Sequence, residues 1–433
     1  MKLIITINAN MNTKSTFSRC KVKSIQFLAF IFLGSSLQAF EIEQTANSVK
    51  DASQWLFKEH ENFYQNKDHP WIHSLSVDGR MHYQTAWLNG TDEYGHDFTD
   101  AYDEIRRLRI GSKMRFLNFL KASLDINLAD DQRYLSGASD DLLKSIDEHD
   151  LEWGFQGFAE AVIEINLDKA TEVSWLDEVS LSLGKMKLET GWERRQSSNE
   201  IYTIERSDLS NTLGGNDSRP VGILAEIDHK KWGAELGVFA GADETDLVGD
   251  WGGGVFTAVG ATWRPQKGLE FAIQHIYAEP SAQDTALGYA SATILETIYH
   301  DERWGFLADA VIGDNGSEQK NGRNGPFGGL VLMPWYWAME DRLQVVLRYQ
   351  FMESEEKEGL RMSSRYLRAG HEESLVDVNN GRGDQLHSIY AGVNYLISGD
   401  NLKLMAGFSF DRLSAPEGDV YARMLQLALR TSF

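Results

Sequence analysis

Apolar and polar residues alternate along most of the chain after Pro70. Between residues 76 and 87, the odd-numbered residues from Val77 to Trp87 share one face of an extended chain, and polar residues such as Arg80 and Gln84 share the other. The same alternation recurs over 118–128 and 341–352. Because successive side chains of a β-strand point to opposite faces of the sheet, this period predicts strands with one apolar and one polar face.

The same template predicts an even number of strands, sixteen in all. Their approximate ranges are 74–88, 104–116, 118–128, 151–167, 177–187, 219–230, 232–242, 253–265, 268–279, 288–299, 302–313, 326–338, 341–352, 385–397, 400–411 and 421–433. An unpaired strand edge is costly in lipid, and a closed barrel has none. We therefore expect an all-β fold: a sixteen-stranded antiparallel transmembrane β-barrel over residues 71–433.

The connections between these strands alternate between long and short. The long ones cover roughly 89–103, 129–150, 188–218, 243–252, 280–287, 314–325, 353–384 and 412–420, and the others are tight. Barrels of the bacterial outer membrane have long outer loops and short periplasmic turns. The alternation therefore predicts an oriented outer-membrane barrel with both ends of the chain in the periplasm.

Two segments precede the predicted barrel. Residues 1–39 carry five basic residues, an apolar run from Ile25 to Leu33 and small residues ending at Ala39, which predicts a secretory signal peptide cleaved after Ala39. A membrane anchor is the alternative, but the run is shorter than the roughly 20 residues that a membrane helix needs. From Glu41 to Lys67 apolar residues recur near helical spacing, which predicts a short N-terminal periplasmic helix within residues 40–70. This helix would be a linker or cap, or alternatively a plug or partner-binding element.

Composition restricts the chemistry. The only cysteine, Cys20, lies in the predicted signal peptide, so the mature chain has no disulfide and no thiol nucleophile. Removing five basic residues from 42 leaves 37 against 64 acidic ones, a formal charge of about −27, which argues against nucleic acid as a partner. The motifs G-x-S-x-G, HExxH, CxxC and the P-loop are all absent from the sequence, so we expect no enzymatic activity, no cofactor and no metal.

Two surface features suggest partners. Acidic clusters in the long loops, such as 92–103 and 353–358, would attract cations or share divalent ions with lipopolysaccharide, or would simply be a solvated surface. The chain ends in Phe433 after Leu425, Leu427 and Leu429 on one face of the last strand. A terminal aromatic residue in this setting resembles the signal that the barrel-assembly machinery of the outer membrane reads.

Several stretches resemble the phosphate-selective porin O and P family. They are Glu104-Ile-Arg-Arg-Leu-Arg-Ile-Gly111, Leu183-Gly-Lys-Met-Lys187 with Ser197-Ser198, Tyr202, Glu205-Arg206-Ser207, Asn211 and Leu213 after it, Arg219-Pro-Val-Gly-Ile223, and Tyr390-Ala-Gly-Val-Asn-Tyr395. The resemblance implies a homotrimeric channel with sixteen strands per subunit, in which the third outer loop folds inward and constricts the pore. The third loop of the strand count is 188–218, where the family-like block also lies.

By position, this loop supplies most of the candidate constriction residues. They are Glu189, Trp192, Glu193, Arg194, Arg195, Tyr202, Glu205 and Arg206. Phosphate selectivity in the family is attributed to lysines of the pore, whereas residues 188–218 contain no lysine, three arginines and six acids. This composition departs from the family pattern and argues against phosphate as the specific solute.

The strand over 104–116 supplies the remaining candidates. Arg107, Arg109, Lys113 and Arg115 share the face opposite Leu108, so they are expected to line the lumen. Opposite an acidic loop they would create a transverse field that acts on passing ions. Alternatively, they would pair with acids of the neighbouring strands, namely Asp125, Glu160 and Glu164.

We therefore expect a passive diffusion channel for small hydrophilic or ionic solutes. Two alternatives remain open at this point: an anion channel specific for phosphate or polyphosphate, and a non-conducting structural or adhesion barrel.

Overall fold

The described part of the chain forms sixteen barrel strands. The computed structural model describes residues 62–131, 151–171, 178–215, 219–242, 247–316, 323–363, 366 and 382–433. The barrel strands are β2 (Ile72–Thr91), β3 (Asp97–Phe116), β4 (Leu120–Asp131), β6 (Phe158–Asn166), β7 (Glu178–Lys185), β8 (Val221–His229), β9 (Trp232–Ala242), β10 (Asp250–Gln266), β11 (Leu269–Ala278), β12 (Ser291–His300), β13 (Trp304–Asp314), β14 (Pro326–Met339), β15 (Leu343–Ser354), β18 (Gln385–Leu396), β19 (Leu402–Ala415) and β20 (Gly418–Ser432). Each overlaps one predicted strand, so the predicted fold class is confirmed.

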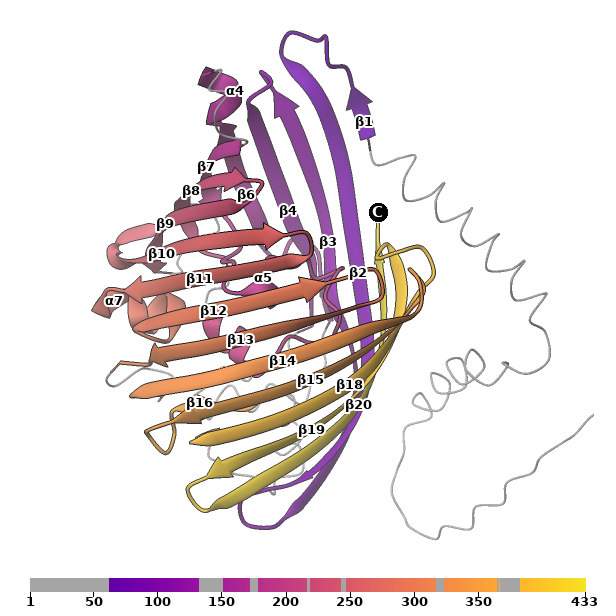
Figure 1. The fold of residues 1–433 in the computed structure, drawn as a ribbon, viewed down its shortest axis with the longest axis vertical. Coiled ribbons are helices and arrows are strands. Elements are labelled where there is room, and N and C mark those ends of the chain that lie inside the picture. Colours follow the sequence, from indigo (N-terminus) through magenta and orange to yellow (C-terminus); the bar gives the residue numbers. More distant parts are fainter. Residues whose placement is uncertain are drawn as a thin grey trace, which may run out of the picture. The chain divides into compact units, whose positions relative to one another are not determined.

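The first and last barrel strands pair with each other and close the sheet. β2 pairs with β20 from Arg80↔Ser432 to Thr91↔Tyr421, and with β3 along its other edge. The other strands pair antiparallel with their neighbours in chain order, and Figure 1 shows the yellow β20 beside the indigo β2. Closure satisfies the backbone hydrogen bonds of both edges without water, which a strand that crosses lipid requires.

Two predicted long loops are wrong. The expected loop over 89–103 is mostly strand, because β2 continues to Thr91 and β3 begins at Asp97. The expected loop over 412–420 is a tight turn between Ala415 and Gly418. Inward-facing residues of these extensions, such as Phe98, are buried, and this packing keeps the strands paired beyond the predicted boundaries.

Two further boundaries differ from the prediction. The expected strand over 151–167 is broken into β5 (Leu151–Trp153) and β6, because Gly154 and Gly157 adopt positive φ between them. Most of the predicted helix over 41–67 lies outside the described residues, but its part from Asn62 to Gln65 is strand β1 rather than helix. β1 pairs with residues 74–76 of β2, just beyond the point where β20 ends, and so satisfies that open edge.

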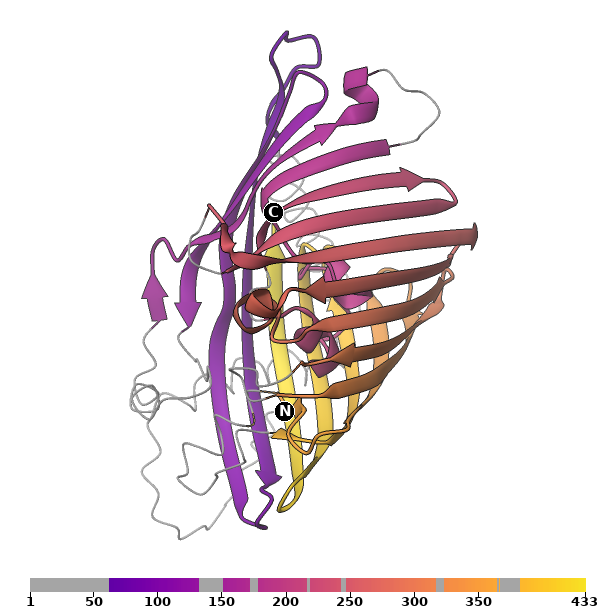
Figure 2. The same cartoon turned by 90° about the vertical axis from the view of Figure 1, so that its left-hand side faces the viewer.

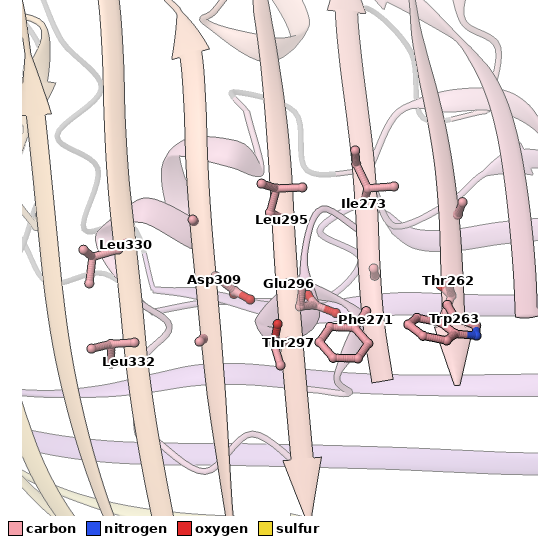
Figure 3. Close-up of a pocket in the computed structure, with 14 residues that line it drawn as sticks. Thr262, Trp263, Phe271, Ile273, Leu295, Glu296, Thr297, Asp309, Leu330 and Leu332 are labelled. Atoms are coloured by element: carbon pink, nitrogen blue, oxygen red, sulfur yellow. The ribbon is translucent and has the colours of Figure 1, made fainter. Parts of the chain in front are cut away.

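The outer face of the barrel is apolar. Large side chains that alternate along the strands are exposed there, among them Leu236, Val259, Ile273, Leu295, Ile312, Leu332, Leu347, Ile389, Phe408 and Leu425. A hollow of about 570 Å³ over β10–β14 is lined mainly by such residues, including Trp263 and Phe271, whose rings stack (Figure 3). This hollow belongs to the surface that a membrane barrel presents to lipid. Within the described residues, no helix is long and apolar enough to cross a membrane.

The inner face is divided into a packed part and a charged part. On β9–β15 many inward side chains are apolar and buried in one cluster, for example Phe256, Ile276 and Leu307. The connection between β11 and β12, with α7 (Pro280–Ala282) and the π-helix η1 (Gln283–Leu287), covers this region with Leu287 and Tyr289. Charged inward side chains, such as Arg80, Arg109 and Asp125, are frequent on β2–β8.

The family-like glycine Gly184 in β7 has a specific structural role. Its φ is +128°, and a Cβ atom there would lie 2.1 Å from the carbonyl oxygen of Ala161 in β6. We expect Gly184→Ala to weaken the β6–β7 pairing and to destabilise the barrel by about 1–3 kcal/mol, because both the φ value and the contact become strained. Heat-dependent gel mobility of the folded barrel measures this loss.

Gly328→Ala in β14 is the matched control for that substitution. Its φ is not in the positive region, and its nearest neighbour, the oxygen of Val311, would lie 3.4 Å from the new Cβ atom. Equal folded fractions for the two variants at every temperature would contradict the role assigned to Gly184.

Candidate functional site

The connection between β7 and β8 folds into the barrel. It contains α5 (Trp192–Arg195) and α6 (Asp208–Leu213), and Figure 2 shows short helices within the ring of strands. Its residues form hydrogen bonds with inward side chains of β2, β3, β11, β12, β15, β18, β19 and β20. We call residues 186–215 the constriction loop, because they cross the lumen and contact its walls.

Arg348 of β15 is the principal anchor of the constriction loop. Its Nη1 donates to Glu193 Oε1 at 3.0 Å, to Thr203 Oγ1 at 3.1 Å and to the carbonyl oxygen of Glu205 at 2.9 Å. The guanidinium also lies 5.5 Å from the ring centroid of Tyr390. Arg348 and Glu193 are 9% and 3% exposed, so each supplies the opposite charge that compensates the other in the interior.

A second set of wall side chains holds the middle of the loop. Arg430 of β20 donates to the carbonyl oxygens of Ser198 and Ile204. Asn394 of β18 donates to the carbonyl oxygen of Tyr202 at 2.7 Å. Since these donors bind backbone oxygens, they fix the path of the loop rather than one particular side chain.

The loop is also organised internally. The Glu193 carboxylate accepts from the backbone N–H of Ser207 at 3.2 Å and from its hydroxyl, while Ser207 Oγ accepts from the Ser210 N–H at the start of α6. Arg206 donates to the carbonyl oxygens of Glu193 and Gln196. Glu193 therefore joins both short helices and the barrel wall.

An aromatic cluster packs the loop against β14. The rings of Trp192 and Trp335 stack at a centroid distance of 6.0 Å, and Tyr202 contacts both. Burial raises the pKa of Tyr202 to about 12, so its phenol is neutral at physiological pH. This cluster stabilises the loop by apolar burial.

Two arginines of α5 contribute to the loop, Arg194 buried and Arg195 partly exposed. Burial lowers the pKa of Arg194 to about 10, which still leaves it charged at neutral pH. Its Nε donates to the carbonyl oxygen of Leu188 at 3.3 Å. Burial disfavours the charge of Arg195 as well, but its ion pairs with Glu296 and Glu270 outweigh this effect and raise its pKa. Both guanidinium groups hold the loop in place.

These contacts show that many of the predicted constriction residues are structural anchors. Glu193, Arg194, Arg195 and Arg206 make the contacts just described. Glu205 accepts from Gln84 Nε2 at 2.9 Å and from Arg106 Nε at 3.1 Å. Glu189 is different: it pairs with Lys187 at 2.8 Å and its side chain is 43% exposed, so it is the predicted loop acid that remains open to the lumen.

The predicted cations of β3 lie on the inner face. Arg107 is opposite His82 and Arg109 is opposite Arg80 in the register with β2. Arg109 donates to the neutral amide of Asn127 at 2.7 Å, and the guanidinium of Arg107 makes no hydrogen bond or ion pair with any described residue. Neither guanidinium is paired with the acids suggested by the sequence.

The other two predicted cations lie nearer the turn between β3 and β4. Lys113 pairs with Asp78 of β2 at 3.2 Å, and Arg115 is exposed. The suggested acids have other partners: Asp125 pairs with Arg80 at 3.5 Å and Glu164 with Lys121 at 2.7 Å. Among the described residues, Arg107 and Arg109 therefore have no acidic hydrogen-bond partner.

Sequence reasoning missed Arg106. Strict alternation assigns it to the outer face with Leu108, but the register of β2 and β3 shifts between His82 and Tyr83. This β-bulge turns Arg106 inward, where it pairs with Glu205. The sequence shows that Arg106 lies next to Arg107, but it does not show the bulge, because the bulge arises from pairing with β2.

A second loop also enters the barrel. In the connection between β15 and β18, with β16 (Leu360–Arg361) and β17 (Arg382–Gly383), the described residues Leu360, Met362 and Tyr366 are buried in the inner cluster. The Tyr366 hydroxyl donates to Asp411 of β19. The two loops therefore narrow the same interior. The sequence predicted the second loop, over 353–384, but did not indicate that it folds inward.

A closed sixteen-stranded barrel with a loop folded across its lumen is the architecture of an outer-membrane porin, a passive diffusion channel. Within that class, the family model described as phosphate-selective porin O and P matches residues 75–285. The match confirms the family resemblance of the sequence, indicates a channel rather than an enzyme, and includes β3 and the whole constriction loop.

Solved structures support the fold. The outer membrane channel DcaP of Acinetobacter baumannii is 11% identical with a TM-score of 0.50, covering 86% of this chain and 99% of that one. An anion-selective porin from Comamonas acidovorans is 13% identical with a TM-score of 0.51, covering 83% and 99%. Salmonella typhi OmpF, in a complex with daunomycin, is 11% identical with a TM-score of 0.51, covering 83% and 98%. No curated protein matches the sequence.

Proposed function

We propose that this porin passes small hydrophilic solutes and prefers small anions. The observation that carries the preference is the state of Arg107 and Arg109, which line the inner face of β3 without an acidic hydrogen-bond partner among the described residues. Fixed cations in a narrow pore lower the electrostatic barrier for anions and raise it for cations.

Three acids of the constriction loop do not oppose this proposal, whereas Glu189 is exposed. The carboxylates of Glu193 and Glu205 are bound to Arg348 and Arg106. Asp208 accepts from Gln350 Nε2 at 3.3 Å. Since these acids are neutralised or hydrogen-bonded where the loop meets the wall, the net charge of the loop sequence is a poor guide to the charge that a solute meets.

The constriction loop would set the size limit. Purified protein in planar bilayers is expected to give stepwise conductance, and liposomes that contain it should swell in small sugars but not in large ones. Folded protein without any conductance would contradict the proposal and favour a non-conducting structural barrel.

Phosphate is a second candidate solute, which the description of the matched family favours. Phosphate would then block the chloride current by occupying the site near Arg107 and Arg109. A chloride current that phosphate leaves unchanged would exclude a phosphate-specific channel while leaving the general anion preference intact.

The same proposal covers the export of the protein, its location and its assembly. Residues 1–39 would direct export and residues 40–70 would precede the barrel in the periplasm. Three copies would assemble in the outer membrane, with lipopolysaccharide around the outer loops. The aromatic end at Phe433, whose backbone pairs with Gly79, would be read by the assembly machinery before β20 closes on β2.

A further inference from the structure

A pocket of about 530 Å³ lies at the short-turn end of the barrel, and its lining includes none of the four cations of β3. Its walls come from the turns between β8 and β9, between β10 and β11 and between β12 and β13, and its floor comes from α5 of the constriction loop. We call it the turn pocket. Its volume is in the range of small-molecule sites, roughly 300–1,000 Å³.

Tight hairpins place lysines at the rim of the turn pocket. Lys230 and Lys231 form the two-residue turn between His229 and Trp232, which pair with each other. Lys267 and Gly268 form the next such turn, and Gly268 has a φ of +78°. β9 and β10 are paired, with an N–H of Arg264 donating to the Lys231 carbonyl oxygen at 2.8 Å, so the two turns are neighbours.

The acid of the turn pocket is already neutralised. Glu270 accepts from Arg264 Nε at 2.9 Å and pairs with Arg195 Nη2 at 3.4 Å. Arg264 also binds Asp228 at 2.7 Å. The ammonium groups of Lys231 and Lys267, by contrast, have no partner among the described residues and are exposed at the rim. The rim therefore offers two lysines to an anion.

The floor of the turn pocket has an apolar part beside Arg195 and Gln196. Trp192 and Ile298 are buried there, and Leu269 lies beside them. An inorganic anion gains no binding free energy from an apolar surface. An apolar group that covers the surface removes the remaining exposed area of these residues from water, which favours binding. The ligand that fits both parts has a negative group for the rim and an apolar body for the floor.

We propose that the turn pocket binds an organic carboxylate with an apolar body, such as an aromatic monocarboxylate. Lys231 and Lys267 bind the carboxylate, and the ring lies over Trp192 and Ile298. The pocket is separate from the β3 cations, so this binding goes beyond the proposed channel function and does not depend on conduction.

The test uses the folded full-length protein in detergent and measures binding by ligand-observed NMR titration. Benzoate is the probe, inorganic phosphate supplies charge without an apolar body, and benzyl alcohol supplies an apolar body without charge. The variant is Lys231→Gln with Lys267→Gln. Its control is Lys169→Gln in α4 (Leu167–Thr171), a lysine of another short connection that does not line the pocket.

We expect benzoate to bind better than either other probe, and the double variant to bind it at least about tenfold more weakly, because two charged contacts are lost. The Lys169 variant should bind like the unmodified protein. Equal benzoate affinity in the double variant, or phosphate binding as strong as benzoate binding, would overturn the proposal. Conductance of the same samples tests the channel separately. A protein that conducts but does not bind benzoate would refute only the proposed binding in the turn pocket.

Discussion

Replacing Arg348 by glutamine is expected to free the constriction loop from the wall of β15. The change removes the ion pair with Glu193 and the hydrogen bonds to Thr203 and Glu205. A buried carboxylate without its partner costs about 3–5 kcal/mol, so the loop should open locally rather than keep Glu193 unpaired in the interior. Hydrogen exchange of residues 192–207 should accelerate, and the channel current should become larger and noisier.

A double variant separates the ion pair from general damage to the barrel. Glu193→Gln together with Arg348→Gln removes both charges, and two neutral amides can still form a hydrogen bond. We expect this variant to recover most of the slow exchange of residues 192–207. Exchange as fast as in Arg348→Gln alone would show that the ion pair is not what holds the loop.

Reversing the charges of Arg107 and Arg109 is expected to reverse the ion preference of the channel. Arg107→Glu with Arg109→Glu replaces two lumen cations by two anions at the position where we expect the pore to be narrow. The zero-current potential in a KCl gradient should change sign, because potassium is then favoured over chloride. The effect should shrink at high salt, where screening shortens the range of these charges.

Arg115→Glu is the matched control for this reversal. Arg115 lies on the same face of the same strand but is exposed near the turn between β3 and β4, opposite Ser74 of β2. Its substitution should move the zero-current potential far less than the double variant does. A comparable shift would mean that selectivity arises at the mouth of the barrel and not at the constriction.

The strands were predictable because lipid imposes a simple rule on each of them. The outward residues must be apolar, and this requirement is visible locally in the alternation of Leu347 and Tyr349 with Arg348 and Gln350. The ends of β2 and β3 were not predictable, since the extension depends on packing of residues such as Phe98 inside the barrel. At Asn62–Gln65, pairing with β2 prevailed over the helical spacing of the sequence.

The constriction loop was located correctly by counting connections, but the roles of its residues were not predictable. Glu193 and Arg348 are 155 positions apart, and the sequence shows no relation between them. The inward turn of Arg106 likewise depends on a bulge against β2. Residue types in a loop indicate which charges are available, whereas only the closed barrel determines which of them are used as anchors.

The zero-current potential of the unmodified channel in a KCl gradient tests the central claim most directly. Purified protein in a planar bilayer should conduct, and the sign of the potential should correspond to chloride passing more readily than potassium. A potential of the opposite sign would contradict the role of Arg107 and Arg109, and a folded protein that never conducts would contradict the channel itself.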